Sequence, residues 1–156
     1  RRAAQMPTTH YITGMIHLVK LCVGAESVDD LANWQKRVIA HRKALGLSPN
    51  PVHETRQSPK RADELLDGGS IYWVIKGVIL ARQEIVEVNV MEDMNGRNYC
   101  ELVLDPEIHP TEPQGRRAFQ GWRYLKPEDA PKDATGSHSA EVPSELTRAL
   151  RDAGVW

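Results

Sequence analysis

The sequence has little of several features that usually reveal a protein's chemistry. Its 156 residues include two cysteines, one phenylalanine, four tyrosines and four tryptophans. Acidic residues number 21 and basic residues 20, for a formal net charge of −1, so no overall field attracts the chain to nucleic acid or to an anionic membrane. Its apolar runs stay well short of the roughly 18 residues that a membrane-spanning helix needs. A charged partner must therefore be recognised by local clusters of side chains.

The scarcity of cysteine argues against a disulfide scaffold. Cys22 and Cys100 both lie in apolar runs and form no C-x-x-C pair, which favours two buried, reduced thiols and leaves a disulfide or a metal site as the alternatives. The first residues lack the apolar segment of a secretory signal. We expect a cytoplasmic protein that has no membrane contact and no metal or other cofactor.

Enzyme signatures are missing as well. The sequence contains no G-x-S-x-G elbow, no G-x-x-x-x-G-K-[ST] phosphate loop and no H-E-x-x-H zinc motif. His109 and Glu112 form a local pairing of a histidine with a carboxylate, and in a proline-rich loop this pair is expected to be solvated. Glu101, Asp105 and Glu107 could supply an acid or base, but alternating acidic residues usually form the wet face of a strand. Catalysis stays open, with no catalytic residue assigned.

The length suits one domain with a substantial core. We expect this domain over residues 15–133. Residues 1–14 show no period and are interpreted as a tag, an upstream extension or a loose arm, with Met15 a candidate start. Residues 134–156 are expected to be a C-terminal tail with a short amphipathic helix over 144–154.

Apolar spacing predicts an N-terminal α part followed by a β part. The elements expected are a strand over 15–24, a helix over 27–45 with a capping box at Ser27 and Asp30, a brief helix over 58–66, a hairpin over 70–90 that turns at Lys76-Gly77, a strand over 98–105 after the Asn95-Gly96 turn, an irregular stretch over 106–117 and a short strand over 118–125.

The valine and isoleucine pattern changes phase between residues 78 and 90, which predicts a β-bulge near Arg82 to Glu84. The fold class expected is therefore α+β, with a small antiparallel sheet that the bulge curls into an open barrel. One main N-terminal helix and short flanking helices would accompany this sheet.

Four separated segments carry a family resemblance: HLVKLCVGAESVDDLANWQ, PKRADELLDGGSIYWVIKGVILARQEI, LVLDPE and FQGWRYLKPEDAP. Together they resemble the bacterial domain-of-unknown-function family 1489 from about Met15 to about Asp133, which implies no particular activity. The second segment is also similar to the central unit of PUA-like folds, including ASCH and EVE domains. That likeness implies a curled sheet that handles RNA or a modified base, although DGGS stands here where Gly-Asp is usual.

The stretch FQGWRYLKPEDAP interleaves cations with aromatic rings. Nucleic acid needs both, because cations bind phosphates and flat rings stack on unpaired bases. For Trp122 a structural role in the core stays open beside stacking. The candidate nucleic-acid-binding residues come from this stretch, the second helix and the central hairpin: Lys60, Arg61, Lys76, Arg82, Arg116, Arg117, Trp122, Arg123, Tyr124 and Lys126.

The function predicted is that of a PUA-like domain that binds RNA or a nucleotide. Two alternatives stay open. A small-molecule enzyme would use Arg82 or Arg123 to hold an anion in a closed cavity, with a carboxylate as base. A protein-interaction module would instead present tryptophan and tyrosine as an exposed apolar patch.

Overall fold

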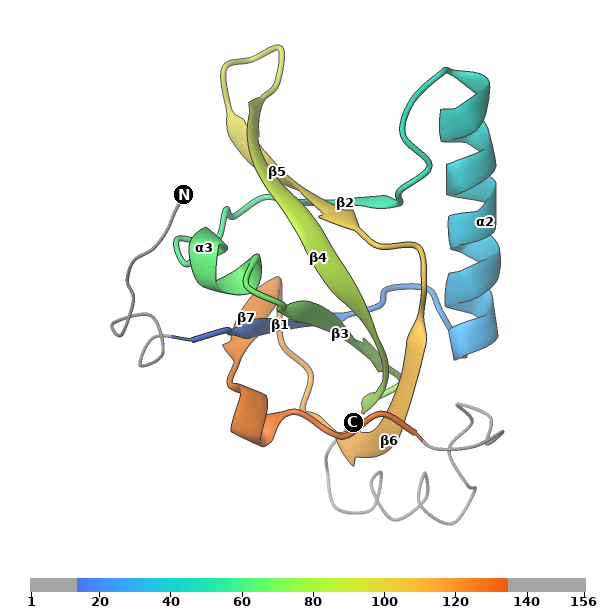
Figure 1. Ribbon diagram of the computed structural model, residues 1–156, viewed down its shortest axis with the longest axis vertical. Coiled ribbons are helices and arrows are strands. Elements are labelled where there is room, and N and C mark those ends of the chain that lie inside the picture. Colours follow the sequence, from blue (N-terminus) through green and yellow to red (C-terminus); the bar gives the residue numbers. More distant parts are fainter. Residues whose placement is uncertain (1–13, 135–156) are drawn as a thin grey trace.

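The computed structural model describes residues 14–134, which combine one long helix with a sheet of seven strands (Figure 1). The fold class α+β is thereby confirmed. The elements in chain order are β1 (His17–Leu21), α2 (Val28–Ala44), β2 (Val52–Thr55), α3 (Ala62–Leu65), β3 (Ser70–Ile75), β4 (Val78–Glu92), β5 (Asn98–Leu104), β6 (His109–Gly115), β7 (Trp122–Leu125) and the 3₁₀ turn η1 (Pro127–Asp129).

The strands form one mixed sheet in the order β2-β5-β4-β3-β1-β7, with β6 paired to β4. Every pair is antiparallel except β1 with β3, which run parallel. A parallel pair needs a long crossover, and the chain supplies it through α2, β2 and α3. The sheet is neither closed nor strongly curled, so the predicted antiparallel barrel is wrong. Strand patterns in the sequence did not show that β1 pairs with β3.

β4 is the longest strand and joins the two halves of the sheet. Its first half pairs with β3 and β6, and its second half pairs with β5. The register shifts between Ile79 and Ala81, and again between Ile85 and Glu87. An irregularity in this strand is therefore confirmed. The sequence placed it at Arg82 to Glu84, which instead lies between the two shifts.

The turns follow the chemistry of their residues. Lys76 and Gly77 both have positive φ, 53° and 81°, as the tight turn between β3 and β4 requires. Gly96 in the loop between β4 and β5 has φ 78°. Both predicted hairpins are confirmed. The first 13 residues of the arm predicted over 1–14 and the helix predicted over 144–154 lie outside the described residues.

Two strands, β2 and β6, lie where the sequence predicted loops. Both segments are rich in proline, and β6 contains Pro110 and Pro113. Proline cannot donate to a ladder but is tolerated on edge strands, and β2 pairs on one side only, with β5. The second helix is also shorter than predicted, since α3 covers only Ala62–Leu65. Because these two segments are rich in proline, the sequence predicted loops where the edge strands β2 and β6 lie.

Both cysteines are free thiols, as predicted. Cys100 is fully buried in the main core, whereas Cys22 is only half-buried at its margin. The expectation that both would be buried is thus correct for one of them. Burial raises the pKa of the Cys22 thiol to about 11, which keeps it protonated and unreactive at neutral pH.

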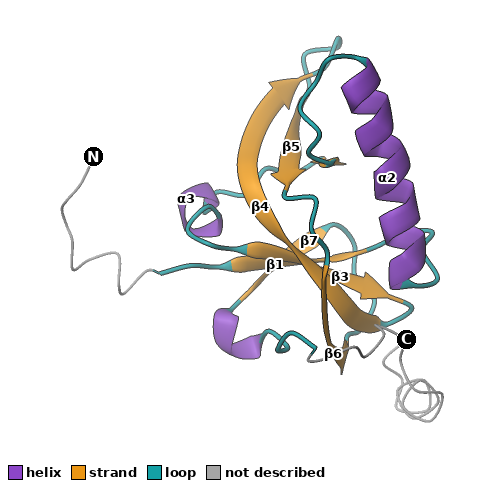
Figure 2. Cartoon of the chain, turned by 45° about the vertical axis from the view of Figure 1, so that its right-hand side comes forward, coloured by secondary structure: helices purple, strands orange, loops and turns teal. Residues whose placement is uncertain are grey.

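α2 lies to one side of the sheet (Figure 2) and begins at the predicted capping box. The Asp30 N–H donates to Ser27 Oγ at 3.2 Å, and the Glu26 N–H donates to the Asp30 carboxylate at 2.8 Å. The apolar residues whose spacing predicted a helix over 27–45 are poorly buried, since Trp34 is 43% exposed and the C-cap Leu45 is 61% exposed. Only Leu31 and Gln35 of this helix are buried. Apolar packing is therefore not the main attachment of α2.

A buried amide network attaches α2 to the sheet instead. Gln35 on α2 and Gln83 on β4 exchange two hydrogen bonds of 2.8 and 2.7 Å. Gln83 Oε1 also accepts from the Trp73 indole N–H at 2.9 Å, and its Nε2 donates to the Asp105 carbonyl at 3.1 Å. Gln83 has no exposed surface. One side chain thus links the helix, two strands and the turn after β5.

We predict that Gln83→Leu destabilises the fold more than Gln35→Leu does. The first change leaves the Gln35 amide, the Trp73 N–H and the Asp105 carbonyl without their partner, whereas the second affects only Gln83. Each buried polar group left unpaired costs about 1–3 kcal/mol, so Gln83→Leu should cost about 3 kcal/mol or more. Urea unfolding measures both. The double variant should cost less than the sum of the two, and strict additivity would contradict the network.

Candidate functional site

Trp122 and Tyr124 lie on the same face of β7, the edge strand beside β1. Their rings meet edge to face, with centroids 4.9 Å apart. Trp122 is 9% exposed and belongs to the main core. Its indole N–H donates to the Gln57 carbonyl at 2.8 Å. Of the two roles left open for Trp122, the structure shows the structural one.

Tyr124 is half-buried and connects β7 to the segment before α3. Its hydroxyl accepts from the Arg61 backbone N–H at 3.0 Å. The Arg61 guanidinium lies over the Tyr124 ring, 5.3 Å from its centroid, and also forms an ion pair with Glu64 at 2.6 Å. These contacts occupy Tyr124 and Arg61 within the fold.

Arg123, which lies on the opposite face of β7, borders a shallow hollow that we call the arginine pocket. The Arg123 guanidinium lies there over the ring of Phe119, 5.6 Å from its centroid. The backbone N–H of Arg116 donates to the Gly77 carbonyl at 2.8 Å, which places Arg116 beside the turn between β3 and β4. The pocket has a volume of about 660 Å³ and is lined by Gly115, Arg116, Arg117, Ala118, Phe119, Arg123 and Tyr124.

Three of the sequence-predicted cations are engaged in ion pairs. Lys76 Nζ lies 2.6 Å from Glu26, and Arg82 forms a two-pronged pair with Asp133 at 2.8 Å. Arg82 also donates to Ser70 Oγ. The Arg82 guanidinium hydrogen-bonded to Asp133 lowers the pKa of that carboxyl. With Arg61, these residues have partners inside the protein and are poor candidates for a ligand contact.

The other five sequence-predicted cations form no ion pair with any carboxylate among residues 14–134. Lys60 and Lys126 are exposed and lie outside the arginine pocket. The remaining three line it together with Phe119: Arg116, Arg117 and Arg123. The structure therefore brings together part of the predicted surface, and Phe119 is the ring beside these arginines.

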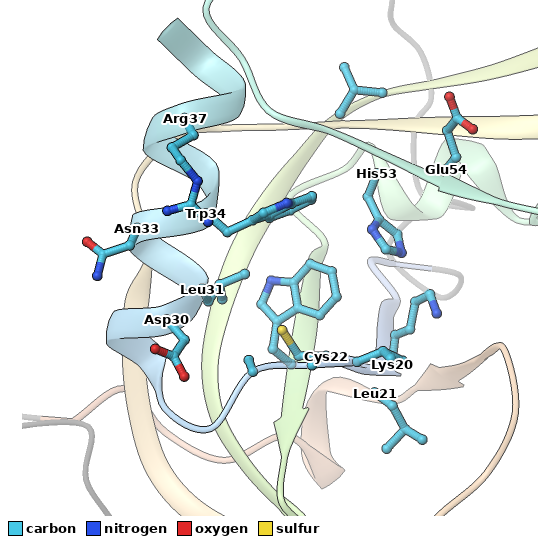
Figure 3. Close-up of a pocket in the computed structure, with 15 residues that line it drawn as sticks. Lys20, Leu21, Cys22, Asp30, Leu31, Asn33, Trp34, Arg37, His53 and Glu54 are labelled. Carbon is cyan, nitrogen blue, oxygen red and sulfur yellow. The ribbon is translucent and has the colours of Figure 1, made fainter. Parts of the chain in front are cut away.

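A larger cavity of about 850 Å³, the lysine cavity, lies between α2, the loop before it, and strands β1 and β2 (Figure 3). Lys20, Trp34 and His53 extend toward one another across it. The sequence analysis missed this site. A signal was present, since Lys20 has the same parity as Leu18 and Cys22 within an apolar run, so a strand would turn it to the core face.

Charge is disfavoured inside the lysine cavity. Burial, and then the positive charge of Lys20, lower the pKa of His53 to about 4. Burial also lowers the pKa of Lys20 itself. Nε2 of His53 is buried and has no hydrogen-bond partner. At neutral pH the cavity thus holds a neutral imidazole with an unsatisfied nitrogen beside an ammonium group.

Two further properties bear on the chemistry. Within the described part of the chain, no three histidine, cysteine, aspartate or glutamate side chains gather to hold a metal ion. In the same part, no helix is both long and apolar enough to cross a membrane.

The fold and these surfaces define an α+β domain on a mixed seven-stranded sheet. The arginine pocket lies on one face of the sheet, and the lysine cavity lies beneath α2. The family described as "Protein of unknown function (DUF1489)" matches residues 18–156, and the chain belongs to this family. The predicted family resemblance is confirmed. Searches of curated proteins and of solved structures returned no match. The likeness to PUA-like folds stays a prediction.

We predict that acid destabilises the protein partly through His17. Its Nδ1 accepts from the Ser70 N–H at 2.9 Å, and burial followed by the charge of Arg82 lowers its pKa from 6.5 to about 4. Between pH 6.5 and 4 the unfolded chain therefore protonates His17 while the folded chain keeps it neutral. The contribution of His17 to the free energy of unfolding is fully present above pH 6.5 and declines as the pH falls toward 4. The loss should be on the order of 1–3 kcal/mol.

His17→Asn checks this prediction, because its side-chain oxygen can accept the Ser70 N–H without titrating. Urea unfolding at pH 8 measures the cost of the substitution itself, since His17 is neutral there in both states. The difference between pH 8 and pH 4.5 should then be smaller in the variant than in the wild type. Equal differences would show that His17 carries none of the pH dependence.

Proposed function

We propose that this domain binds RNA through the arginine pocket, holding a few phosphates and one unstacked base. The observation that carries the proposal is the gathering of Arg116, Arg117 and Arg123 around Phe119 in one hollow. None of the three forms an ion pair with a carboxylate among the described residues. Arginines with no carboxylate partner in residues 14–134 can bind an external anion.

The chemistry of the pocket matches a partner that is both anionic and flat. A guanidinium group binds phosphate oxygens in a forked geometry. The stack of Arg123 on Phe119 provides a planar surface, and bases of single-stranded RNA stack on aromatic rings and on guanidinium planes. The overall charge of −1 argues against a long basic groove, so we expect a footprint of a few nucleotides.

The contact set proposed is narrower than the one that the sequence suggested. Trp122 is omitted because it is buried, and Arg61, Lys76 and Arg82 because they pair with carboxylates. Phe119 with Arg123 replaces Trp122 or Tyr124 as the stacking platform. Lys60 and Lys126 are exposed outside the pocket, so the proposed contacts are limited to the three arginines and Phe119. The proposal does not depend on the predicted PUA-like likeness, because that likeness implies a curled sheet and the sheet here is not strongly curled.

The residues at the pocket favour binding over the two alternatives. An enzyme needs an acid or base beside its substrate, and no carboxylate or histidine is found among the described residues that line the arginine pocket. A protein-interaction patch built on Trp122 would need that ring exposed, but it is buried. RNA or nucleotide binding therefore uses the available groups best.

We predict that a fluorescently labelled single-stranded RNA of mixed sequence binds with a shallow salt dependence. Three arginines on three phosphates give a slope of log K against log salt of about −2, from about 0.7 per phosphate. Arg116→Ala with Arg117→Ala should weaken binding and reduce the slope to about −0.7. Phe119→Ala should cost about 1–3 kcal/mol of binding free energy with the slope unchanged. Fluorescence anisotropy measures both quantities.

The matched control removes the same charge elsewhere. Lys36 and Lys43 are exposed cations of α2, and the double variant Lys36→Ala with Lys43→Ala should keep both the affinity and the slope. If that control weakens binding as much as the arginine pair does, the interaction is not localised at the pocket. If the wild type binds no tighter than about 10⁻⁴ M at low salt, the level of non-specific binding, the proposal fails.

A further inference from the structure

The lysine cavity has the size and composition of a small-molecule site, and it shares no lining residue with the arginine pocket. Its volume of about 850 Å³ falls within the range of roughly 300–1,000 Å³ typical of ligand cavities. Such sites combine apolar and aromatic walls with a few placed polar groups. What the cavity could bind follows from these polar groups.

Lys20 stands at an unusual position for a charged residue. It lies on β1, between β3 and β7, with Trp73 and Trp122 as its neighbours in register. Leu18, two residues earlier on the same face, has no exposed surface. No carboxylate among residues 14–134 lies within ion-pair distance of Lys20. A half-buried ammonium group without a counter-charge is costly to the fold, and a bound anion would compensate it.

His53 provides the second polar group. Its ring extends from β2 toward Lys20 (Figure 3) and packs edge-on against Trp73, with centroids 5.1 Å apart. Nε2 of this ring is buried without a hydrogen-bond partner. An unsatisfied buried nitrogen costs on the order of 1–3 kcal/mol. A ligand atom that formed a hydrogen bond with Nε2 would remove this cost. Lys20, which has no carboxylate partner among residues 14–134, lines the same cavity as His53.

The walls complete the chemistry of the site. Trp34 projects from α2 into the cavity, although it is 43% exposed there. The Trp73 N–H is already bonded to Gln83, so this ring offers only its apolar body. The two acidic lining residues are directed away from Lys20, and Asp30 already accepts the Glu26 N–H. Nothing acidic therefore competes with an anion for Lys20.

We propose that the lysine cavity binds a small planar molecule carrying a carboxylate, with Lys20 holding the carboxylate, the Nε2–H of His53 donating a hydrogen bond to it and Trp34 packing on the ring. The three groups reach the cavity from β1, β2 and α2, and each lacks something that such a ligand supplies. Within residues 14–134, Lys20 has no carboxylate at ion-pair distance, Nε2 of His53 has no hydrogen-bond partner, and Trp34 is incompletely buried.

The test uses 2-naphthoate and benzoate as probes, with 2-naphthamide and benzamide as uncharged partners of the same shape. NMR follows the Trp34 indole N–H and the His53 ring during each titration. We expect 2-naphthoate to shift both signals with a dissociation constant below roughly 10 mM, a weak but measurable affinity for a fragment-sized ligand. The amides should bind about tenfold more weakly, because they leave the ammonium unpaired.

Lys20→Met separates recognition from packing, because methionine keeps an unbranched apolar stem. It should weaken 2-naphthoate about tenfold while leaving the amide unchanged, so that the preference for the acid disappears. It should also raise the midpoint of thermal unfolding, since an uncompensated cation is removed. A purely structural lysine would instead lower the midpoint and affect acid and amide equally.

Two other variants keep the test decisive. Trp34→Ala changes an exposed helix residue, folds regardless of the cavity, and should weaken acid and amide alike. Lys36→Met makes the same exchange on α2 outside the cavity and should change nothing. The assignment is overturned if neither acid shifts the two signals at roughly 10 mM. It is also overturned if Lys20→Met binds 2-naphthoate as tightly as the wild type does. Lys20→Gln replaces Lys20→Met in this comparison if the methionine variant does not fold.

Discussion

The rest of the structure depends on one buried amide, that of Gln83. Strand β4 would place a hydrophobic residue here in most sheets, yet Gln83 is fully buried and bonded to Gln35, Trp73 and the carbonyl of Asp105. An apolar contact tolerates sliding, whereas a reciprocal amide pair has one geometry. It fixes the height and rotation of α2 on the sheet. The network therefore sets the position of every α2 side chain relative to β1, β2 and β3.

Anchoring through amides explains why a cavity exists beneath α2. A helix that packed by a full apolar stripe would bury Trp34 and fill the space in front of β1. Here Gln35 holds the helix, Leu31 is its only buried apolar residue, and Trp34 borders open volume instead. The same anchoring leaves Lys20 room to extend into the cavity. Polar attachment of α2 thus costs packing density and provides the space that a ligand could occupy.

Local patterns predicted what local physics decides. The capping box of α2, the turn at Lys76-Gly77 and the hairpin at Gly96 appear as predicted, because a few adjacent residues determine them. Pairing is not local, so the parallel contact of β1 with β3 was missed and a barrel was expected. Prolines concealed the edge strands β2 and β6. For the site, the clustering of charge and rings was visible, but which rings were buried was not. Lys20 was overlooked because its neighbours suggested only a strand.

Strand alternation separates the two candidate sites. In the pairing of β1 with β7, Lys20 is opposite Trp122 and Val19 is opposite Arg123. Partners in register share a face, so Lys20 and Trp122 lie on the face covered by α2, and Arg123 lies on the other. A shift of one residue in either strand would exchange these faces. The register of β1 with β7 thus directs Lys20 toward the lysine cavity and Arg123 toward the arginine pocket. This side of the sheet therefore borders two separate hollows that share no lining residue.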